Sequence, residues 1–337
     1  MKVILFLTSA LLQLSVVSQT VSADSMNRKW TKATINIQCT YSMMQYFAAL
    51  GQASKNHMLP DSIIRLQQQF IINNPIKSNG SAIFVVDKGN YYLLSARHVF
   101  QDPTALRQGA LCNWIRLIDN PAKAKIPDYV RVDTFANVTT VYETASDDIH
   151  ILNGMFGKLS DSTYIFSDSS EDLAIVDLSI RPDGEGFIKT LLNRKYEPIK
   201  LSDIDSQCYL KKDQDIIAVG YPEHSIVKKY ERPAAAEIWM PSEISIPIVS
   251  MGKIARPNVR KKFFEGNIFT YHGSSGGAIV RNNKLIGIVS RFENDTTKSQ
   301  AGDLLYFVSH FIFIKSSLIM PLLRSLQRSN AEMLKHE

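Results

Sequence analysis

Residues 271–280 read YHGSSGGAIV and combine a sharp turn with the start of an apolar strand. Gly276 and Gly277 come directly after Ser275, so the backbone can turn tightly and present the hydroxyl. Gly273 lets a second backbone N–H point the same way as that of Ser275. Two such donors can hold the oxyanion of a tetrahedral acyl-transfer intermediate. A simple Gly/Ser hairpin turn also explains this pattern.

A serine hydroxyl needs a base, and His98 is the candidate among seven histidines. It stands just past the apolar run 91–94, where the chain leaves a strand. His272 is only three residues from Ser275, but that spacing does not aim its ring at the hydroxyl, so it is interpreted as a specificity or packing residue. The remaining histidines are interpreted as structural: His57, His150, His224, His310 and His336.

An imidazole base needs a carboxylate that holds its tautomer. Asp172 stands at the head of the apolar run 173–178, where a carboxylate can be partly buried if an imidazole pairs with it. Asp177, inside the same run, is the alternative.

Together these segments resemble the motifs of the trypsin/chymotrypsin-like serine peptidase family, in the family's order. The similar stretches are 94–99 (LSARHV, histidine motif), 172–176 (DLAIV, aspartate motif) and 273–277 (GSSGG, serine motif). Two lesser matches are 287–290 (GIVS), similar to the strand that lines the substrate cleft, and 218–222 (AVGYP), similar to a second-barrel strand of bacterial members. The resemblance covers about residues 76–325 and is strongest to bacterial, HtrA-like relatives.

The resemblance implies an all-β fold of two antiparallel six-stranded β-barrels (chymotrypsin-like), with the active site between them. It implies a serine endopeptidase acting on polypeptide substrates, with no metal or organic cofactor. The implied catalytic residues are His98, Asp172 and Ser275, and the implied oxyanion hole is Gly273 with Ser275. The implied substrate-binding residues are Phe269, Thr270, Ser290, Arg291 and Phe292.

Several features depart from the family pattern. Arg97 replaces the usual alanine before the histidine, and Val99 replaces the cysteine of digestive members. Only 62 residues follow Ser275, so we expect no PDZ domain there. No Ile-Val-Gly-Gly motif occurs, so we do not expect activation of a zymogen by a new N-terminus. Residues 267–270 hold no carboxylate, which favours a small or apolar substrate side chain before the scissile bond.

The pattern of short strands independently predicts a sandwich or a barrel pair. A hairpin is expected from strands 82–86 and 91–94, and further strands at 129–132, 138–142, 173–178, 216–219, 244–248, 278–280, 285–289 and 304–308, with turns at 181–186 and Asn282-Asn283. The expected domain order is a signal peptide (1–23), an N-terminal extension (24–75) with a helix from Asp61 to Phe70, the first barrel (76–190), the second barrel (191–313), and a C-terminal helix and tail (314–337).

Composition sets the broad class of the protein. The chain has 337 residues, 45% hydrophobic and 21% charged, which excludes a disordered protein or a coiled-coil rod. The net charge of +6 is diffuse, so basic clusters at Lys228-Lys229 and 260–262 are interpreted as solvated loops, with no nucleic-acid partner.

Residues 1–23 predict export, to the periplasm or outside the cell, because a short basic start precedes an apolar run and small residues. Export would place Cys39, Cys112 and Cys208 in an oxidising compartment, where at most one internal disulfide can form. The apolar stretch 304–323 is interpreted as a strand and a helix, because His310 and Lys315 argue against a membrane span. No stable membrane insertion is therefore expected.

Two other functions fit parts of the sequence. Residues 273–277 also satisfy the G-x-S-x-G elbow of α/β-hydrolases, but that class needs an acid and then a histidine after the serine, and an alternating strand–helix pattern that is absent here. The chain could also be a non-catalytic peptidase homologue that keeps the cleft as a binding module.

Overall fold

The computed structural model describes residues 28–42, 44–56, 58–73, 76–102, 111–118, 148–150, 165–167, 171–179, 182–221, 226–231, 240–245, 247–259, 261–268, 270, 272–298 and 305–333. The predicted signal peptide and the predicted strands 129–132 and 138–142 lie outside these residues. Within the described part of the chain, no helix has the length and hydropathy needed to cross a membrane.

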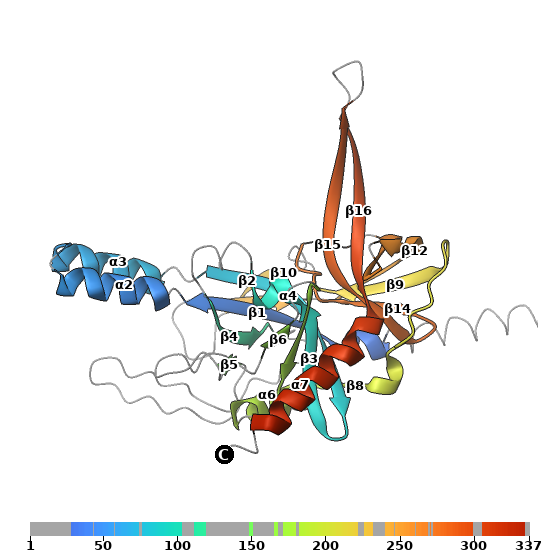
Figure 1. Ribbon diagram of the computed structural model, residues 1–337, viewed down its shortest axis with the longest axis horizontal. Coiled ribbons are helices and arrows are strands. Elements are labelled where there is room, and N and C mark those ends of the chain that lie inside the picture. The colour runs from blue at the N-terminus through green and yellow to red at the C-terminus, as the bar shows by residue number, and fades with distance from the viewer. Residues whose placement is uncertain are drawn as a thin grey trace, which may run out of the picture.

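The second half of the chain forms a closed barrel of six antiparallel strands, ordered β12-β13-β16-β15-β14-β9. Its strands are β9 (Asp215–Gly220), β12 (Ile248–Val259), β13 (Phe263–Asn267), β14 (Ala278–Arg281), β15 (Lys284–Lys298) and β16 (Leu305–Lys315). Ile216, Phe264 and Phe313 belong to its buried core. The predicted six-stranded second barrel is confirmed. Beyond the barrel, β15 and β16 continue as a long two-stranded arm that stands away from the body (Figure 1).

The first half forms an eight-stranded sheet, ordered β5-β4-β1-β2-β3-β7-β6, with β8 beside β2. Its strands are β1 (Thr34–Ser42), β2 (Ile76–Asp87), β3 (Asn90–Ala96), β4 (Leu111–Leu117), β5 (Asp148–His150), β6 (Ile165–Ser167), β7 (Leu173–Asp177) and β8 (Ile199–Lys200). The predicted hairpin is β2 and β3, joined through Lys88 and Gly89, whose φ angles are 50° and 89°. A sheet followed by a closed barrel is consistent with the expected chymotrypsin-like double barrel.

The first sheet begins well before residue 76, where the sequence predicts its boundary. Strand β1 lies between β2 and β4 and pairs with both. Ile35 and Ile37 are fully buried, but so are the polar Thr34 and Asn36 on the other face of the strand. A strand covered on both faces usually reads as a continuous apolar run, and the buried Thr34 and Asn36 interrupt that run in β1. The segment therefore does not stand out as a strand in the sequence.

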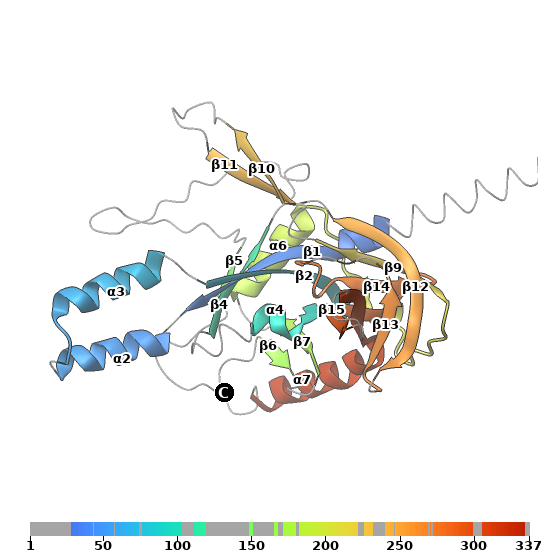
Figure 2. The same ribbon diagram turned by 90° about the horizontal axis from the view of Figure 1, so that it is seen from above.

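Two helices stand between β1 and β2: α2 (Met44–Lys55) and α3 (Asp61–Asn73). They lie side by side and extend away from the sheet (Figures 1 and 2). The predicted helix from Asp61 is confirmed and runs three residues past Phe70. The predicted N-terminal extension is therefore a strand of the first sheet followed by a helical insertion.

Residues 181–186 do not form the predicted turn, because helix α6 (Pro182–Asn193) begins there. Proline suits the first turn of a helix, where its missing N–H has no partner to lose. Phe187 and Leu191, one helical turn apart, are both fully buried. This packing stabilises a helix that the two glycines of the segment otherwise disfavour.

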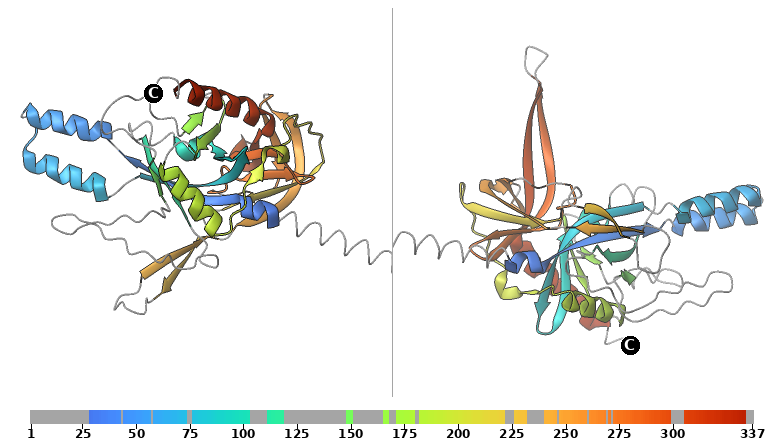
Figure 3. Two further views of the ribbon diagram at one scale, coloured as in Figure 1. Left: turned by 90° about the horizontal axis from the view of Figure 1, so that it is seen from below. Right: turned by 180° about the vertical axis from the view of Figure 1, so that it is seen from behind.

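The C-terminal helix α7 (Ile319–Met333) starts later than the predicted residue 314. Strand β16 continues to Lys315, and one 3-10 turn, η4 (Ser316–Leu318), precedes the helix. The spacing of Leu318, Leu322, Leu323 and Leu326 predicts one buried stripe; the last three are buried, whereas Leu318 is half-buried and lies in the 3-10 turn. Helix α7 contacts β6 and β7 of the first sheet. The helix thus returns from the second barrel to the first (Figures 1 and 3).

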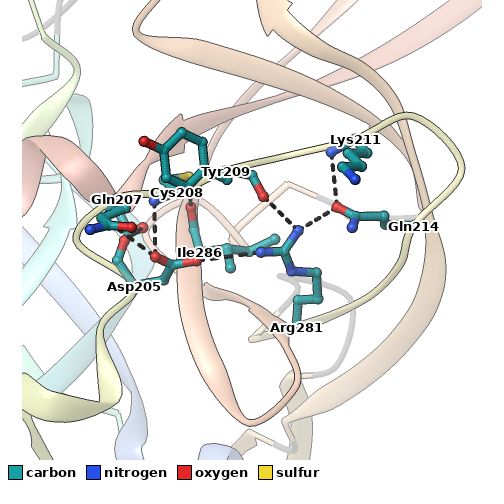
Figure 4. Close-up of polar contacts among 9 residues, drawn as sticks. Asp205, Gln207, Cys208, Tyr209, Lys211, Gln214, Arg281 and Ile286 are labelled. Atoms are coloured by element: carbon teal, nitrogen blue, oxygen red, sulfur yellow. Dashed lines mark hydrogen bonds and ion pairs between the residues drawn. The ribbon is translucent and has the colours of Figure 1, made fainter.

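Arg281, at the end of β14, holds the segment that connects the two halves (Figure 4). Its guanidinium donates to the carbonyl of Tyr209 at 2.8 Å and to the side-chain oxygen of Gln214, and it lies 3.4 Å from a carboxylate oxygen of Asp205. The connecting segment is therefore fixed to the second barrel rather than free to swing.

Cys39, Cys112 and Cys208 are all buried and free, so the expected disulfide is not formed in this structure. Cys39 on β1 and Cys112 on β4 are hydrogen-bonded neighbours. Burial, together with the hydrogen bond and charge of Cys112, raises the pKa of the Cys39 thiol. The Cys39 thiol is thus held in its neutral form in the core.

Candidate active site

His98 lies in the short helix α4 (Arg97–Phe100), which follows directly after β3. Strand β3 pairs with β7 so that Ala96 faces Leu173, and the N–H of Arg97 donates to the carbonyl of Asp172 at 3.0 Å. This register places His98, which follows Arg97, beside Asp172, which precedes β7. His98 and Asp172, far apart in sequence, become neighbours because two strands of one sheet end together.

The imidazole of His98 and the carboxylate of Asp172 form a close pair. Nδ1 of His98 lies 2.9 Å from Oδ2 and 3.1 Å from Oδ1 of Asp172. The backbone N–H of His98 also donates to Oδ1 at 3.0 Å. With Nδ1 held by the carboxylate, the imidazole can carry its proton there and leave Nε2 as the acceptor, which is the tautomer that a general base requires.

The Asp172 carboxylate is mostly buried and is stabilised by several donors. Burial alone would raise the pKa of this carboxyl. The hydrogen bond and charge of His98, together with the hydrogen bond from the Ser290 hydroxyl and the backbone N–H of His98, outweigh burial and lower the pKa below its ordinary value. Asp172 therefore stays ionised where a negative charge can stabilise an imidazolium.

Asp177, the alternative carboxylate, lies at the opposite end of β7. It faces Tyr92 across the sheet, and its carboxylate accepts the N–H of Ser179 at 2.9 Å. A strand of five residues thus separates it from the His98 end of the sheet. Of the two candidates, the structure brings only Asp172 to His98.

Ser275 sits in a turn that depends on glycine. Gly273 and Gly276 have φ angles of 91° and 85°, a region that L side chains rarely adopt. A Cβ at Gly276 would lie 1.9 Å from the carbonyl oxygen of Ser81, so the close approach of two backbones also requires glycine there. The predicted sharp turn around Ser275 is confirmed.

The hydroxyl of Ser275 donates to the backbone carbonyl of Ser290 at 3.0 Å. Among the described residues, no hydrogen bond joins it to His98. Ser290 nevertheless links the parts of the site, because its own hydroxyl donates to Oδ2 of Asp172. Ser275 and the His98–Asp172 pair therefore meet at one residue of β15, which lies in the second barrel.

The remaining predicted substrate-binding residues are placed as follows. Arg291 is exposed and lies over the ring of Phe263, with 5.6 Å from its guanidinium carbon to the ring centroid. Thr270 is half-buried. Phe292 pairs with Phe311 at the base of the β15–β16 arm. Phe269 and the side chain of Phe292 lie outside the described part of the structure.

Sequence reasoning does not identify the polar contacts that hold the site together. The family resemblance predicts that Ser290 lines the substrate cleft, whereas its hydroxyl contacts Asp172. Ser81 and Ser95 are both fully buried and bonded near the Ser275 turn, and no motif singles out either of them. The only local feature that marks Ser81 is its position between Gly80 and the apolar run 82–86.

Among the described side chains there is no cluster of three His, Cys, Asp or Glu residues. A hollow of about 420 Å³ lies between β9, β12 and β14, lined in part by Met251 and Arg281. Neither His98 nor Ser275 lines this hollow. The hollow is therefore separate from the candidate site.

Comparison with known proteins gives one family. No curated protein matches the chain. One solved structure, described as "Aromatic interactions drive the coupled folding and binding of the intrinsically disordered Sesbania mosaic virus VPg protein", is 10% identical over 70% of this chain and 78% of that chain, but its TM-score of 0.33 is too low to carry an argument. Residues 80–288 match the family described as trypsin-like peptidase domain, and this match begins at the first barrel and includes His98, Asp172 and Ser275. Since it spans more than half of the chain, the protein belongs to the trypsin-like peptidase domain family.

Proposed function

We propose that the protein is a serine endopeptidase that hydrolyses peptide bonds through an acyl-enzyme. The observation that carries this proposal is the His98–Asp172 pair at 2.9 Å, which meets Ser275 across Ser290. The pair supplies an oriented base, and the glycine turn presents the half-buried hydroxyl of Ser275. Family membership supports the same class of chemistry.

In the proposed reaction, the Ser275 hydroxyl turns from the Ser290 carbonyl toward Nε2 of His98. Its oxygen attacks the scissile carbonyl carbon while His98 takes the proton, and Asp172 stabilises the imidazolium. The N–H groups of Gly273 and Ser275 hold the oxyanion. The C–N bond then breaks, His98 gives its proton to the leaving amine, and a water molecule hydrolyses the ester by the same route.

A second candidate is a non-catalytic peptidase homologue that binds polypeptides. The observation in its favour is that the Ser275 hydroxyl donates to Ser290 rather than to His98. However, a rotation about one side-chain bond is enough to redirect a hydroxyl, and catalytic hydrogen bonds often form only when substrate is bound. The observation is therefore compatible with either function.

Reaction with a fluorophosphonate probe tests the two candidates. The mature wild-type protein is expected to be labelled at Ser275, with Ser275→Ala unlabelled and inactive on a denatured protein substrate but equally stable to heat. Ser274→Ala is the matched control, because it removes the neighbouring hydroxyl and should still be labelled. Full activity of Ser275→Ala would overturn the assignment, and a folded wild-type protein without labelling would favour the binding module.

The residue preference at the cleaved bond also belongs to this proposal. We propose a small or apolar side chain before the scissile bond, because residues 267–270 carry no carboxylate that could pair with arginine or lysine. A peptide-library cleavage profile of the purified protein checks this preference. Predominant cleavage after basic residues would contradict it.

We further propose that the chain is exported, secreted or periplasmic, with residues 1–23 removed as a signal peptide. The short basic start, the apolar run and the small residues before position 24 support this. Cell fractionation followed by N-terminal sequencing of the mature protein tests it. A cytoplasmic protein that retains Met1 would contradict it.

A further inference from the structure

Ser81, on β2 of the first sheet, reaches across to the second half of the chain. Its hydroxyl donates to the carbonyl of Gly273 at 3.1 Å and accepts the backbone N–H of Tyr221 at 2.9 Å. The side chain is fully buried. Both of its partners are backbone groups of the second half, so this hydroxyl forms a bridge between the two halves of the molecule.

The backbone of Ser81 makes two further contacts. Its N–H donates to the carbonyl of Ser275 at 2.7 Å, and its carbonyl accepts the hydroxyl of Ser95 at 2.7 Å. Ser81 therefore holds two carbonyls of one tripeptide, those of Gly273 and Ser275. These carbonyls lie on either side of the peptide unit that carries the Ser275 N–H.

The Gly273–Ser275 turn defines its own geometry only in part. The Ser274 carbonyl accepts the N–H of Gly277 at 2.8 Å, whereas the carbonyls of Gly273 and Ser275 are held from the first sheet. Gly273 has a φ of 91° and, lacking a Cβ, has more accessible backbone conformations than other residues. A carbonyl held from outside restricts the rotation of the peptide units that flank it. Two fixed carbonyls thus limit where the N–H groups of Gly273 and Ser275 can point, and oxyanion stabilisation depends on donors that are already aimed.

We propose that Ser81 is a positioning residue, which acts from the first sheet to hold the Gly273–Ser275 turn with its N–H groups aimed at the oxyanion. This inference rests on the proposed peptidase function. The Ser81 hydroxyl would thus contribute to stabilisation of the transition state although it does not contact the substrate. Substrate binding in the ground state should not depend on it.

The test compares Ser81→Ala with Ser95→Ala. Both variants lose one fully buried hydroxyl from the same sheet, but only Ser81 bonds the Gly273 carbonyl. We expect Ser81→Ala to lower kcat by about 10- to 100-fold with KM within about 3-fold of wild type, less than the loss of a whole oxyanion donor. Ser95→Ala should keep kcat within about 3-fold.

A transition-state analogue separates positioning from general damage. The inhibition constant of a peptidyl trifluoromethyl ketone should rise in Ser81→Ala by the same factor by which kcat/KM falls, while that of a non-cleavable ground-state peptide stays unchanged. If Ser81→Ala fails to fold, Ser81→Cys keeps the shape of the side chain, with a slightly larger atom and a weaker donor, and should show the same loss in kcat.

The outcomes distinguish this inference from the function on which it rests. An active wild-type protein with equal kcat in folded Ser81 and Ser95 variants overturns the role of Ser81 and leaves the peptidase intact. Equal weakening of the ketone and the ground-state peptide also overturns it. A folded wild-type protein that neither turns over substrate nor reacts with fluorophosphonate overturns the proposed function, and the role of Ser81 with it.

Discussion

Among single residues, the Asp172 carboxylate has the most directed contacts of the site. It accepts the imidazole N–H and the backbone N–H of His98, and the hydroxyl of Ser290. All three donors favour the ionised form, which explains why its pKa lies below the ordinary value despite burial. The charge at this position should therefore affect both activity and stability toward acid.

Asp172→Asn should lose activity and change how stability depends on pH. Because the folded-state pKa of Asp172 is depressed, its contribution to the free energy of unfolding is present above the unfolded-state pKa of about 3.9 and is lost as pH falls through the folded value. The variant lacks this contribution, so its stability should fall less than that of wild type between pH 7 and pH 3. Its kcat should fall roughly 10⁴-fold, because an amide favours the wrong imidazole tautomer.

Urea unfolding at pH 7, 5 and 3 measures the first effect, and peptide hydrolysis the second. Asp177→Asn serves as the comparison, since the same exchange at the far end of β7 leaves His98 paired. Parallel loss of stability with acid in wild type and Asp172→Asn would contradict the argument.

Ser290→Ala should destabilise the ionised form of Asp172, because it removes the hydroxyl that donates to this carboxylate. The backbone carbonyl of Ser290, which accepts the Ser275 hydroxyl, is kept. The lost hydrogen bond to a charged acceptor should lower the free energy of unfolding by about 1–3 kcal/mol at pH 7. The pKa of Asp172 should rise, since one of the groups that lower it is gone. Thermal unfolding at pH 7 and pH 3 measures the loss, which should shrink in acid, and a loss independent of pH would contradict it.

Among the elements, the β2–β3 hairpin has a turn whose first residue is poorly suited to its backbone. Lys88 has a φ of 50°, and Gly89 follows at 89°. Turns with two residues at positive φ favour Asn-Gly, because asparagine tolerates the left-handed region better than lysine does. The turn is thus formed by the pairing of β2 and β3 rather than by its own residues.

Lys88→Asn is expected to stabilise the protein by about 0.5–1 kcal/mol, by relieving the backbone at that position. The residue is exposed and remote from Ser275, so kcat should not change. Urea unfolding of the variant measures the gain. Lys77→Asn, at an exposed position within β2, is the control and should bring no gain, and a destabilised Lys88→Asn would show that the lysine side chain itself matters.

In the whole molecule, the site exists because the two halves meet along a polar seam. Ser81 reaches Gly273 and Tyr221, and Ser290 reaches Asp172. An ion pair extends this seam: Lys262, in the turn between β12 and β13, lies 3.0 Å from Glu171. Glu171 is 15% exposed and immediately precedes Asp172, so this contact fixes the first half beside the Asp172 carboxylate.

Glu171→Gln should lower kcat several-fold, because it removes the ion pair that joins Glu171 to Lys262. In a double-mutant cycle with Lys262→Met, the coupling free energy should be about 0.5–1 kcal/mol, because the pair is only partly exposed. The pair Lys189–Glu185, on the surface of α6, is the matched control, and its removal should leave kcat unchanged. If the changes in unfolding free energy caused by Glu171→Gln and Lys262→Met add without any coupling, that result would contradict a stabilising role for this ion pair.

The sequence predicted those features that depend on local pattern. Short apolar runs separated by Lys88-Gly89 or Asn282-Asn283 predicted the hairpins, and the glycines around Ser275 predicted its sharp turn. It failed where both faces of an element are buried or where packing outweighs local propensity. Strand β1 carries buried polar residues, and α6 begins within a segment rich in turn residues. The catalytic roles of His98, Asp172 and Ser275 stay predictions until activity is measured.

The sequence alone determined the family motifs, the main hairpins and the identity of the three candidate side chains, because short motifs and turn residues are written in consecutive residues. The six-stranded second barrel followed only from the family resemblance, since the strand pattern fits a sandwich as well. Only the tertiary structure decided which carboxylate meets His98, since Asp172 and Asp177 differ only in which end of β7 they occupy. It also decided that Ser81 and Ser290 hold the site together. Hydrogen bonds between distant strands depend on register and on how two halves of a chain pack, and no local stretch of sequence specifies either.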